Sequence, residues 1–315
     1  MTTTLGLLLF GVGLGVLGPR RLERSSWLTR SPLLGILAWL TLSLTVFVSF
    51  VWAGVTVAAH AMPDGGWLGS AVHACSVLLS EEGVWKQSPV IPALGAALSF
   101  GAVGALFGAV QIARRRERSQ LRRKRDLLEV VCAPHSEPDV MVLEHHVPSV
   151  FCLPGGRGAS VVVSRGALDC LSESQLQQVL AHERAHLASR HHLILRWADA
   201  FAVVLRGRLG SAQARIRIAE LVEMHADDAA GRHNRRDLAE AVIALAGGAH
   251  PTGALGAGGS ALSRVRRLTA PVKPISQVAR GGILLSLLTM VLAPGIIALT
   301  PGLSAIFVDA CPFFF

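Results

Sequence analysis

Four long stretches without Asp, Glu, Lys or Arg constrain the fold of this chain more than any other feature. They cover about residues 2–18, 33–58, 89–113 and 281–308. A helix crosses the bilayer core with roughly 17–25 apolar residues, so each stretch is long enough to span a membrane. The chain of 315 residues is also 51% hydrophobic and only 16% charged, which is too apolar for an ordinary soluble domain. We therefore expect a multi-pass α-helical membrane protein.

The two terminal stretches need separate consideration. The first begins at the initiator methionine, and Arg20, Arg21 and Arg24 follow it. A signal peptide has its positive charges before the apolar run, so we expect a retained span, with a cleaved signal peptide as the alternative. The fourth stretch contains Pro294 and Pro301, which predict a kinked or broken helix.

Basic residues cluster on one side of the four stretches. The segments 19–32, 114–125 and 264–280 are basic, and 114–125 alone has eight basic residues and one acid. Loop 59–88 has one lysine against three acids. The positive-inside rule therefore places residues 114–280 in the cytoplasm, and both termini outside the plasma membrane. The membrane topology then explains the net charge of +9, so we expect no nucleic-acid partner. A nucleic-acid-binding arm at 114–125 is the alternative.

This pattern predicts three regions. Residues 1–113 hold three spans, residues 114–280 form a cytoplasmic domain, and residues 281–315 form the fourth span and a short external tail. The middle region is long enough to bury a core of its own. Its cysteines, Cys132, Cys152 and Cys170, have no disulfide or zinc spacing, so we expect buried reduced thiols.

Strand and helix signals in the middle region indicate an α+β domain. "SVFCLPG" and "ASVVVS" are typical of short strands on either side of a "GGRG" turn. A helix follows from Ser172, whose spacing to Gln175 is that of a capping box, and this helix is expected to continue through His191 and His192. Further helices are predicted at about 211–231 and 235–246, before a flexible Gly-rich loop, "GGAHPTGALGAGGSA".

The first of these helices carries a group suited to metal binding. His182 and His186 are four residues apart, so they share one helix face and can hold one ion. Glu183 lies on the adjoining edge of that face. This is the arrangement of zinc proteases, in which two imidazoles bind Zn²⁺ and a neighbouring carboxylate takes a proton from water. The flanking charged and amide side chains make a position inside the bilayer too costly for this helix.

A catalytic zinc ion needs one more protein ligand. The segment "AELVEMHADDAAG" offers four carboxylates on another helix, and Glu223 and Asp227 share a face because they are four apart. One of this pair can bind zinc while the other accepts the free N–H of a ligand histidine. Glu220 is the alternative ligand, one turn earlier, and His225 is expected to point away.

Together, "VVVSRGALDCLSESQLQQVLAHERAH" and "EMHAD" resemble the gluzincin membrane proteases, in particular the BlaR/MecR-type sensor-transducer peptidases and, more distantly, the HtpX-type proteases. The resemblance implies a cytoplasmic zincin-like α+β protease domain with one Zn²⁺ per chain. It implies His182, His186 and Glu223 as ligands, Glu183 as the general base and Asp227 as the partner of a ligand histidine. BlaR/MecR sensors carry a penicillin-binding domain with S-x-x-K after the last span, and this chain contains no such motif.

The favoured function is a membrane-anchored zinc endopeptidase that cleaves cytoplasmic or membrane-associated proteins, with a repressor in a signalling pathway as one substrate class. An HtpX-like quality-control protease and a non-catalytic zinc-stabilised signalling scaffold are the alternatives. The expected partners are a protein substrate and the lipid bilayer, and the pattern also allows a homo-oligomer or a sensor partner. We further expect the strand 159–164 to offer an edge on which an extended substrate binds.

Overall fold

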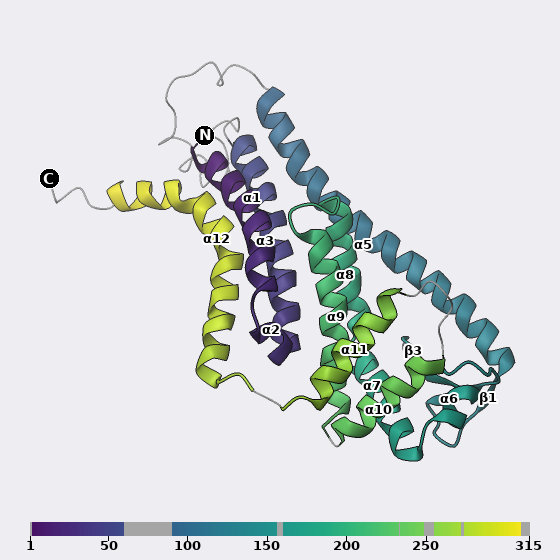
Figure 1. Ribbon diagram of the computed structural model, residues 1–315. Coiled ribbons are helices and arrows are strands. Elements are labelled where there is room, and N and C mark those ends of the chain that lie inside the picture. Colours follow the sequence, from purple (N-terminus) through teal and green to yellow (C-terminus); the bar gives the residue numbers. More distant parts are fainter. Residues whose placement is uncertain are drawn as a thin grey trace.

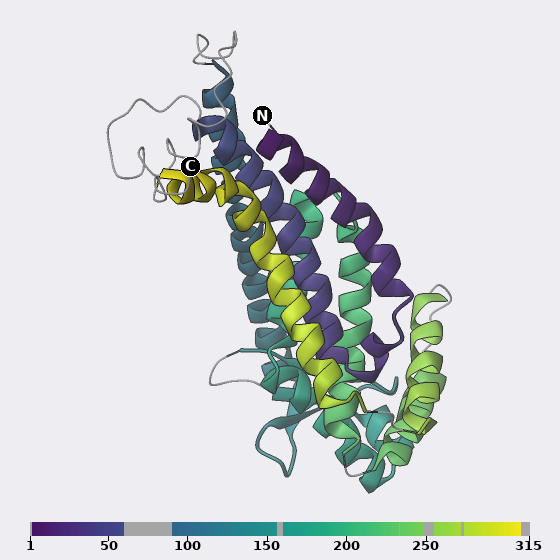
Figure 2. The same cartoon turned by 90° about the vertical axis from the view of Figure 1, so that its left-hand side faces the viewer.

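The computed structural model of the chain describes residues 2–59, 90–155, 160–232, 234–248, 255–271 and 274–309. Most of these residues are helical, and a small sheet lies at one end of the molecule (Figure 1). Within this part of the chain, four helices are long and apolar enough to cross a membrane. They are α1 (Thr2–Glu23), α3 (Pro32–Ala59), α5 (Val90–Val131) and α12 (Gln277–Asp309). In Figures 1 and 2, α1, α3 and α12 lie side by side, and α5 contacts α3 but diverges from it toward the sheet.

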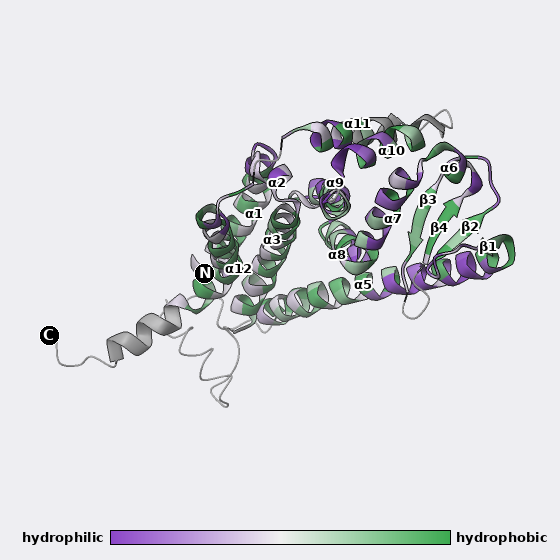
Figure 3. Ribbon diagram, turned by 90° about the horizontal axis from the view of Figure 1, so that it is seen from below, coloured by the Kyte–Doolittle hydropathy of each residue, from purple (hydrophilic) through white to green (hydrophobic). Residues whose placement is uncertain are grey.

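Two of the long helices differ from the sequence-based expectation. Helix α5 has 42 residues and continues through the basic segment 114–125. That segment holds Arg, Lys, Glu, Gln and Leu and no Gly or Pro, so it favours helix continuation. Figure 3 shows α5 changing from hydrophobic to hydrophilic along its length. Helix α12 is continuous through Pro294 and Pro301, so it is not broken, but Figure 1 shows it bending toward its C-terminal end, in agreement with the predicted kink.

Some predicted segments fall on parts of the chain outside the described residues. These are loop 59–88 after its first residue, residues 156–158 of the "GGRG" turn with the following residue 159, and residues 249–254 of the Gly-rich loop. The rest of that Gly-rich stretch was wrongly predicted as a loop, because α11 begins at its middle and spans Leu255–Thr269. Leu268 and Val265 of α11 pack against α9 and α10, and this burial overrides the low helix propensity of the glycines.

The sheet is mixed and has the strand order β1-β2-β4-β3. β1 (Cys132–Pro134) is antiparallel to β2 (Val140–Leu143), β2 is parallel to β4 (Ser160–Ser164), and β4 is antiparallel to β3 (Val150–Leu153). Both predicted strands, β3 and β4, are present. The predicted substrate edge was wrong, because β4 lies between two strands. Its three valines are fully buried, as a continuous β-branched run in a central strand should be, and β3 is the edge strand instead.

Helices cover one side of the sheet and connect it to the long helices. The short α6 (Arg165–Cys170) leads to α7 (Glu173–Ala188), and α8 (His191–Val204), α9 (Ser211–Ala230) and α10 (Arg235–Gly248) follow. The predicted capping box is confirmed: the Ser172 hydroxyl accepts from the Gln175 N–H, and Gln175 Oε1 accepts from the Ser172 N–H. The predicted continuation through His191 was wrong. α7 ends at Ala188, and the chain turns through Arg190, which has a left-handed φ of 50°.

Helices α8 and α9 form a hairpin that lies between α3 and α5 (Figure 1). Ile36, Trp39 and Leu42 of α3 form one buried cluster with Ile218 and Leu221 of α9. Next to a membrane span, such packing stabilises the helix pair mainly through close van der Waals contact. The helix that carries part of the predicted site is therefore held by a candidate membrane span. The predicted division at residues 113 and 280 stays a prediction.

Candidate metal centre

Helix α7 presents the two predicted ligand histidines on one face. The Nε2 atoms of His182 and His186 lie 3.1 Å apart, one helical turn from each other. His182 is buried and His186 is partly buried. Burial is the largest influence on both imidazoles and favours their neutral form, and it lowers the pKa of His186 to about 4. For His182, hydrogen bonds to Asp227 and Glu223 outweigh burial, so the net result is a pKa raised to about 9.

Glu223 of α9 completes a group of three ligand atoms. Its Oε2 lies 3.5 Å from His182 Nε2, and its Oε1 lies 3.6 Å from His186 Nε2. All three ligand atoms lie within 4.8 Å of one another. An ion about 2.0–2.2 Å from each atom fits such a triangle, and two imidazoles with one carboxylate are ligands that zinc accepts. Glu220 does not join this group, because its carboxylate pairs with Arg217 at 2.9 Å.

Asp227 lies one turn after Glu223 and holds the other ring nitrogen of His182. Its Oδ1 is 3.1 Å from His182 Nδ1, and its side chain is fully buried. Arg264 of α11 donates two hydrogen bonds to the same carboxylate, at 2.6 and 2.9 Å. Burial alone would raise the pKa of Asp227, but the bonds from Arg264 and His182 lower it to about 2. Asp227 is therefore an anion that can fix the tautomer and the ring orientation of His182.

Glu183 faces the other side of the cleft, toward strand β3. Burial raises the pKa of its carboxyl group, and contacts with His182 and with Cys152 of β3 offset part of this effect. A raised carboxyl pKa suits a general base, because its proton affinity then lies closer to neutral pH. Burial and the charge of Glu183 raise the pKa of Cys152 to about 12. The Cys152 thiol therefore stays protonated and is no nucleophile at neutral pH.

Two further histidines extend the metal centre. His191 Nδ1 lies 2.9 Å from His186 Nδ1, and His191 Nε2 lies 2.9 Å from His225 Nδ1. If His186 uses Nε2 for a metal, its Nδ1 carries the proton and donates to His191, which then donates to His225. Burial and the neighbouring imidazoles lower the pKa of His191 to about 3, so it is neutral and can accept this bond. His225 is not part of the ligand group, but it contacts the centre through His191.

Arg184 anchors the metal helix from its opposite face. It donates to both carboxylate oxygens of Asp139, at 2.8 and 2.7 Å, and also to Glu137. These carboxylates belong to the turn before β2. Hydrogen bonds from Arg184 lower the pKa of both Glu137 and Asp139. The ion pairs between Arg184 and these two carboxylates fix the direction of α7 relative to the sheet.

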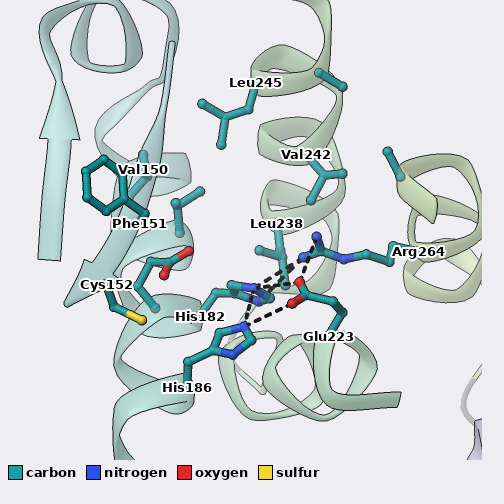
Figure 4. A pocket seen from close by; sticks show the side chains of 14 residues that line it. Val150, Phe151, Cys152, His182, His186, Glu223, Leu238, Val242, Leu245 and Arg264 are labelled. Atoms are coloured by element: carbon teal, nitrogen blue, oxygen red, sulfur yellow. Dashed lines mark hydrogen bonds and ion pairs between the residues drawn. The ribbon is translucent and has the colours of Figure 1, made fainter. Parts of the chain in front are cut away.

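The three ligands lie at the floor of a cleft with a volume of about 540 Å³. Figure 4 shows the edge strand β3 on one side of this cleft and the apolar side chains of α10 on the other. Its lining comprises Val150, Phe151, Cys152, Val179, His182, Glu183, His186, Glu223, Leu238, Val242, Leu245, Ala246, Ala261 and Arg264. The cleft is thus apolar on its walls and polar at the ligand group. This combination is typical of a site for peptide chains or small molecules.

Sequence reasoning missed three functional candidates in this centre. Arg264 was interpreted only as part of a basic segment, and Cys152 only as a buried thiol. His191 was placed on the wrong helix. No local pattern marks Arg264 or Cys152, because both reach the site through tertiary packing. A histidine five residues after His186 was a signal for His191, but only the turn at Arg190 brings its ring back to the metal face.

Comparison with known families agrees with this chemistry. Residues 114–252 match the sequence profile of Peptidase family M48. The matched region includes α7 and α9, and therefore all three grouped ligand residues. The match supports a membrane-associated metallopeptidase, and the zinc use of this family implies zinc as the metal. No curated protein and no solved structure matches the chain.

Proposed function

We propose that this protein is a membrane-anchored zinc endopeptidase that hydrolyses peptide bonds of cytoplasmic or membrane-associated proteins. The observation that carries the proposal is the convergence of three ligand atoms, from His182, His186 and Glu223, at the floor of a cleft. The three ligand residues lie in the part of the chain that matches Peptidase family M48, residues 114–252, whereas Ala261 and Arg264 of the cleft lining lie beyond it. The three residues would hold one zinc ion per chain.

Glu183 and Asp227 each have a role in this proposal. A bound zinc ion supplies Lewis acidity, which polarises the scissile carbonyl and acidifies water. Glu183 accepts a proton from the attacking water as its oxygen bonds to the carbonyl carbon. Glu183 then passes this proton to the amide nitrogen as the C–N bond breaks. Asp227 keeps the ring of His182 oriented through its Nδ1.

The substrate would bind as an extended chain along β3. In the β3–β4 pair, the Ser164 N–H donates to the Ser149 carbonyl. Every second residue of β3 after Ser149 therefore bonds to β4. Val150 and Cys152 are the residues in between, and their backbone groups face the open edge. A peptide pairing with this edge would pass over the ligand group, with its side chains against the apolar wall of α10.

The proposed orientation puts this cleft in the cytoplasm. The start of α1 and the C-terminal part of α12 lie at the end of the molecule away from the sheet and from α7 and α10, which line the cleft (Figures 1 and 2). This arrangement and the basic segments both favour external termini in the plasma membrane. Reporter fusions after residue 125 and at the C-terminus test it. Cytoplasmic reporter activity at the C-terminus would contradict the four-span topology.

The decisive experiment separates metal binding from turnover. The full chain, purified in detergent with zinc, is incubated with fluorescently labelled β-casein. Glu183→Gln should keep its zinc and lose at least about 100-fold in cleavage rate, the lower end of general-base contributions. Glu173→Gln, an exposed change at the start of the same helix, is the control and should retain full activity. Undiminished cleavage by zinc-loaded Glu183→Gln would refute the proposal.

The range of substrates distinguishes the alternatives. A repressor-cleaving protease of the BlaR/MecR type should have few substrates, whereas an HtpX-like quality-control protease should have many. A non-catalytic scaffold should have none, and the burial of Glu183 beside the ligand group disfavours it. Comparing membrane and cytoplasmic proteomes of cells with the native chain and with Glu183→Gln measures this range directly.

A further inference from the structure

A second cavity lies where the short helix α2 (Trp27–Arg30) meets the ends of α9, α10 and α11. Its volume is about 510 Å³, and it shares no lining residue with the metal cleft. The lining comprises Thr29, Arg30, Asp228, Gly231, Arg232, Arg235, Arg267, Ala270 and Pro271. Helix α2 connects α1 with α3, and Ala270 and Pro271 lead toward α12. The cavity therefore lies at the same end of three candidate spans.

Positive charge dominates this cavity. Four guanidinium groups line it against a single carboxylate, that of Asp228. Arg267 and Arg235 both face this carboxylate, at 2.6 and 3.6 Å. Their other donors bind backbone carbonyls: Arg267 binds that of Thr29, and Arg235 binds those of residues 267 and 268. These two arginines are thus fixed in place as part of the cavity wall.

The other two arginines are not neutralised. Arg30 donates to the Ser26 hydroxyl at 3.1 Å, and no carboxylate among the described residues pairs with it. Arg232 is exposed and likewise has no carboxylate partner in the described part of the chain. Counting the four arginines and Asp228, the cavity has an excess of three positive charges, and two guanidinium groups remain available to a ligand.

We propose that this cavity binds a phosphoryl group, supplied by the headgroup of an anionic phospholipid. Guanidinium groups bind phosphate oxygens with paired hydrogen bonds, and several of them around one cavity favour a doubly coordinated anion. The volume suits a headgroup. The position at the ends of three spans is the depth at which lipid phosphates lie, and the basic side of a membrane protein is where anionic lipids are recognised.

Binding here would stabilise the metal centre indirectly. Asp228 follows Asp227 on α9, and Arg267 lies one turn after Arg264 on α11. An anion at the cavity would offset the charge of Arg30 and Arg232 beside the Asp228–Arg267 ion pair, which joins these two helices at their ends. It would thereby favour the packing that holds Arg264 against Asp227. This consequence concerns stability, so the site does not depend on the proposed peptidase activity.

Native mass spectrometry of the full chain in detergent tests the proposal. Phosphatidylglycerol should be retained more strongly than phosphatidylcholine and should raise the melting temperature. The double variant Arg30→Gln/Arg232→Gln should weaken phosphatidylglycerol binding by about 10- to 30-fold, because two guanidinium contacts are lost. Arg30→Lys/Arg232→Lys should keep part of the affinity. Arg20→Gln/Arg24→Gln removes the same charge near the same end and should bind like the native chain.

Each outcome has a distinct meaning. Stabilisation by inorganic phosphate but not by phosphatidylglycerol would keep the phosphoryl site and assign it to a soluble ligand. Equal weakening in the Arg30/Arg232 and Arg20/Arg24 glutamine variants would show general attraction to basic helix ends and would overturn the proposal. Failure of both phosphatidylglycerol and phosphate to bind would overturn it as well.

Discussion

Replacing His191 tests whether the histidine chain positions the metal. His191→Leu removes the acceptor 2.9 Å from His186 Nδ1 in a position that is only 1% exposed, where no bulk water replaces it. The His186 ring then loses the bond that fixes its orientation. Loss of such a partner lowers metal affinity by about 10- to 100-fold, or about 1.4–2.7 kcal/mol. We expect zinc binding by His191→Leu to weaken within this range.

The assay is zinc competition with a chromophoric chelator on the purified full chain, with the cobalt absorption spectrum as a second readout. His192→Leu is the matched control, because His192 directly follows His191 and makes no hydrogen bond to the described residues of the centre, and it should bind zinc normally. His191→Gln can offer an amide oxygen to His186 and should recover part of the affinity. Native zinc affinity in folded His191→Leu would refute the positioning role.

Three further results are expected. Glu223→Ala should lose most of its zinc while Glu220→Ala keeps it, and metal analysis of the purified variants would contradict the ligand assignment if this order were reversed. Val150→Pro removes an open-edge N–H and should raise KM for casein with little loss of stability, whereas Phe151→Pro should destabilise the sheet, because its N–H falls on the β4 side. Arg184→Met should lower the free energy of unfolding by about 1 kcal/mol at neutral pH, because its partners are partly exposed. Its carboxylate partners have lowered pKa values, so this difference should vanish as pH falls through those values, and acid titrations of both chains measure it.

Local patterns carried the predictions that succeeded. The spacing of His182 and His186, the capping box at Ser172 and the four apolar stretches each depend on residues within a turn or a single helix. Periodicity and hydrogen bonding to near neighbours decide such features. Local spacing alone did not identify Glu223 as a ligand, because Asp227 shares its helix face. The choice of Glu223 came from a family resemblance.

Features that depend on contacts between distant segments were not predictable. Strand order is one case: "SVFCLPG" and "ASVVVS" both indicated strands, but nothing local says that β4 is central and β3 is the edge. Arg264 reaches Asp227 from 37 residues away, across a Gly-rich segment that gave no helix signal. The left-handed turn at Arg190 lacks the usual Gly or Asn, so the return of His191 to the metal face was also hidden.

Helix α9 links the candidate metal centre directly to the apolar helix α3. One face of α9 places Ile218 and Leu221 in a buried cluster with α3. Gly35 of α3 allows this approach, because a Cβ there would lie 3.0 Å from the Leu221 side chain. The opposite face of the same helix supplies Glu223 to the ligand group. A fragment of residues 114–280 would expose the apolar face of α9 to water and would loosen the helix that sets the position of Glu223. The candidate membrane span is therefore a structural part of the metal centre as well as an anchor.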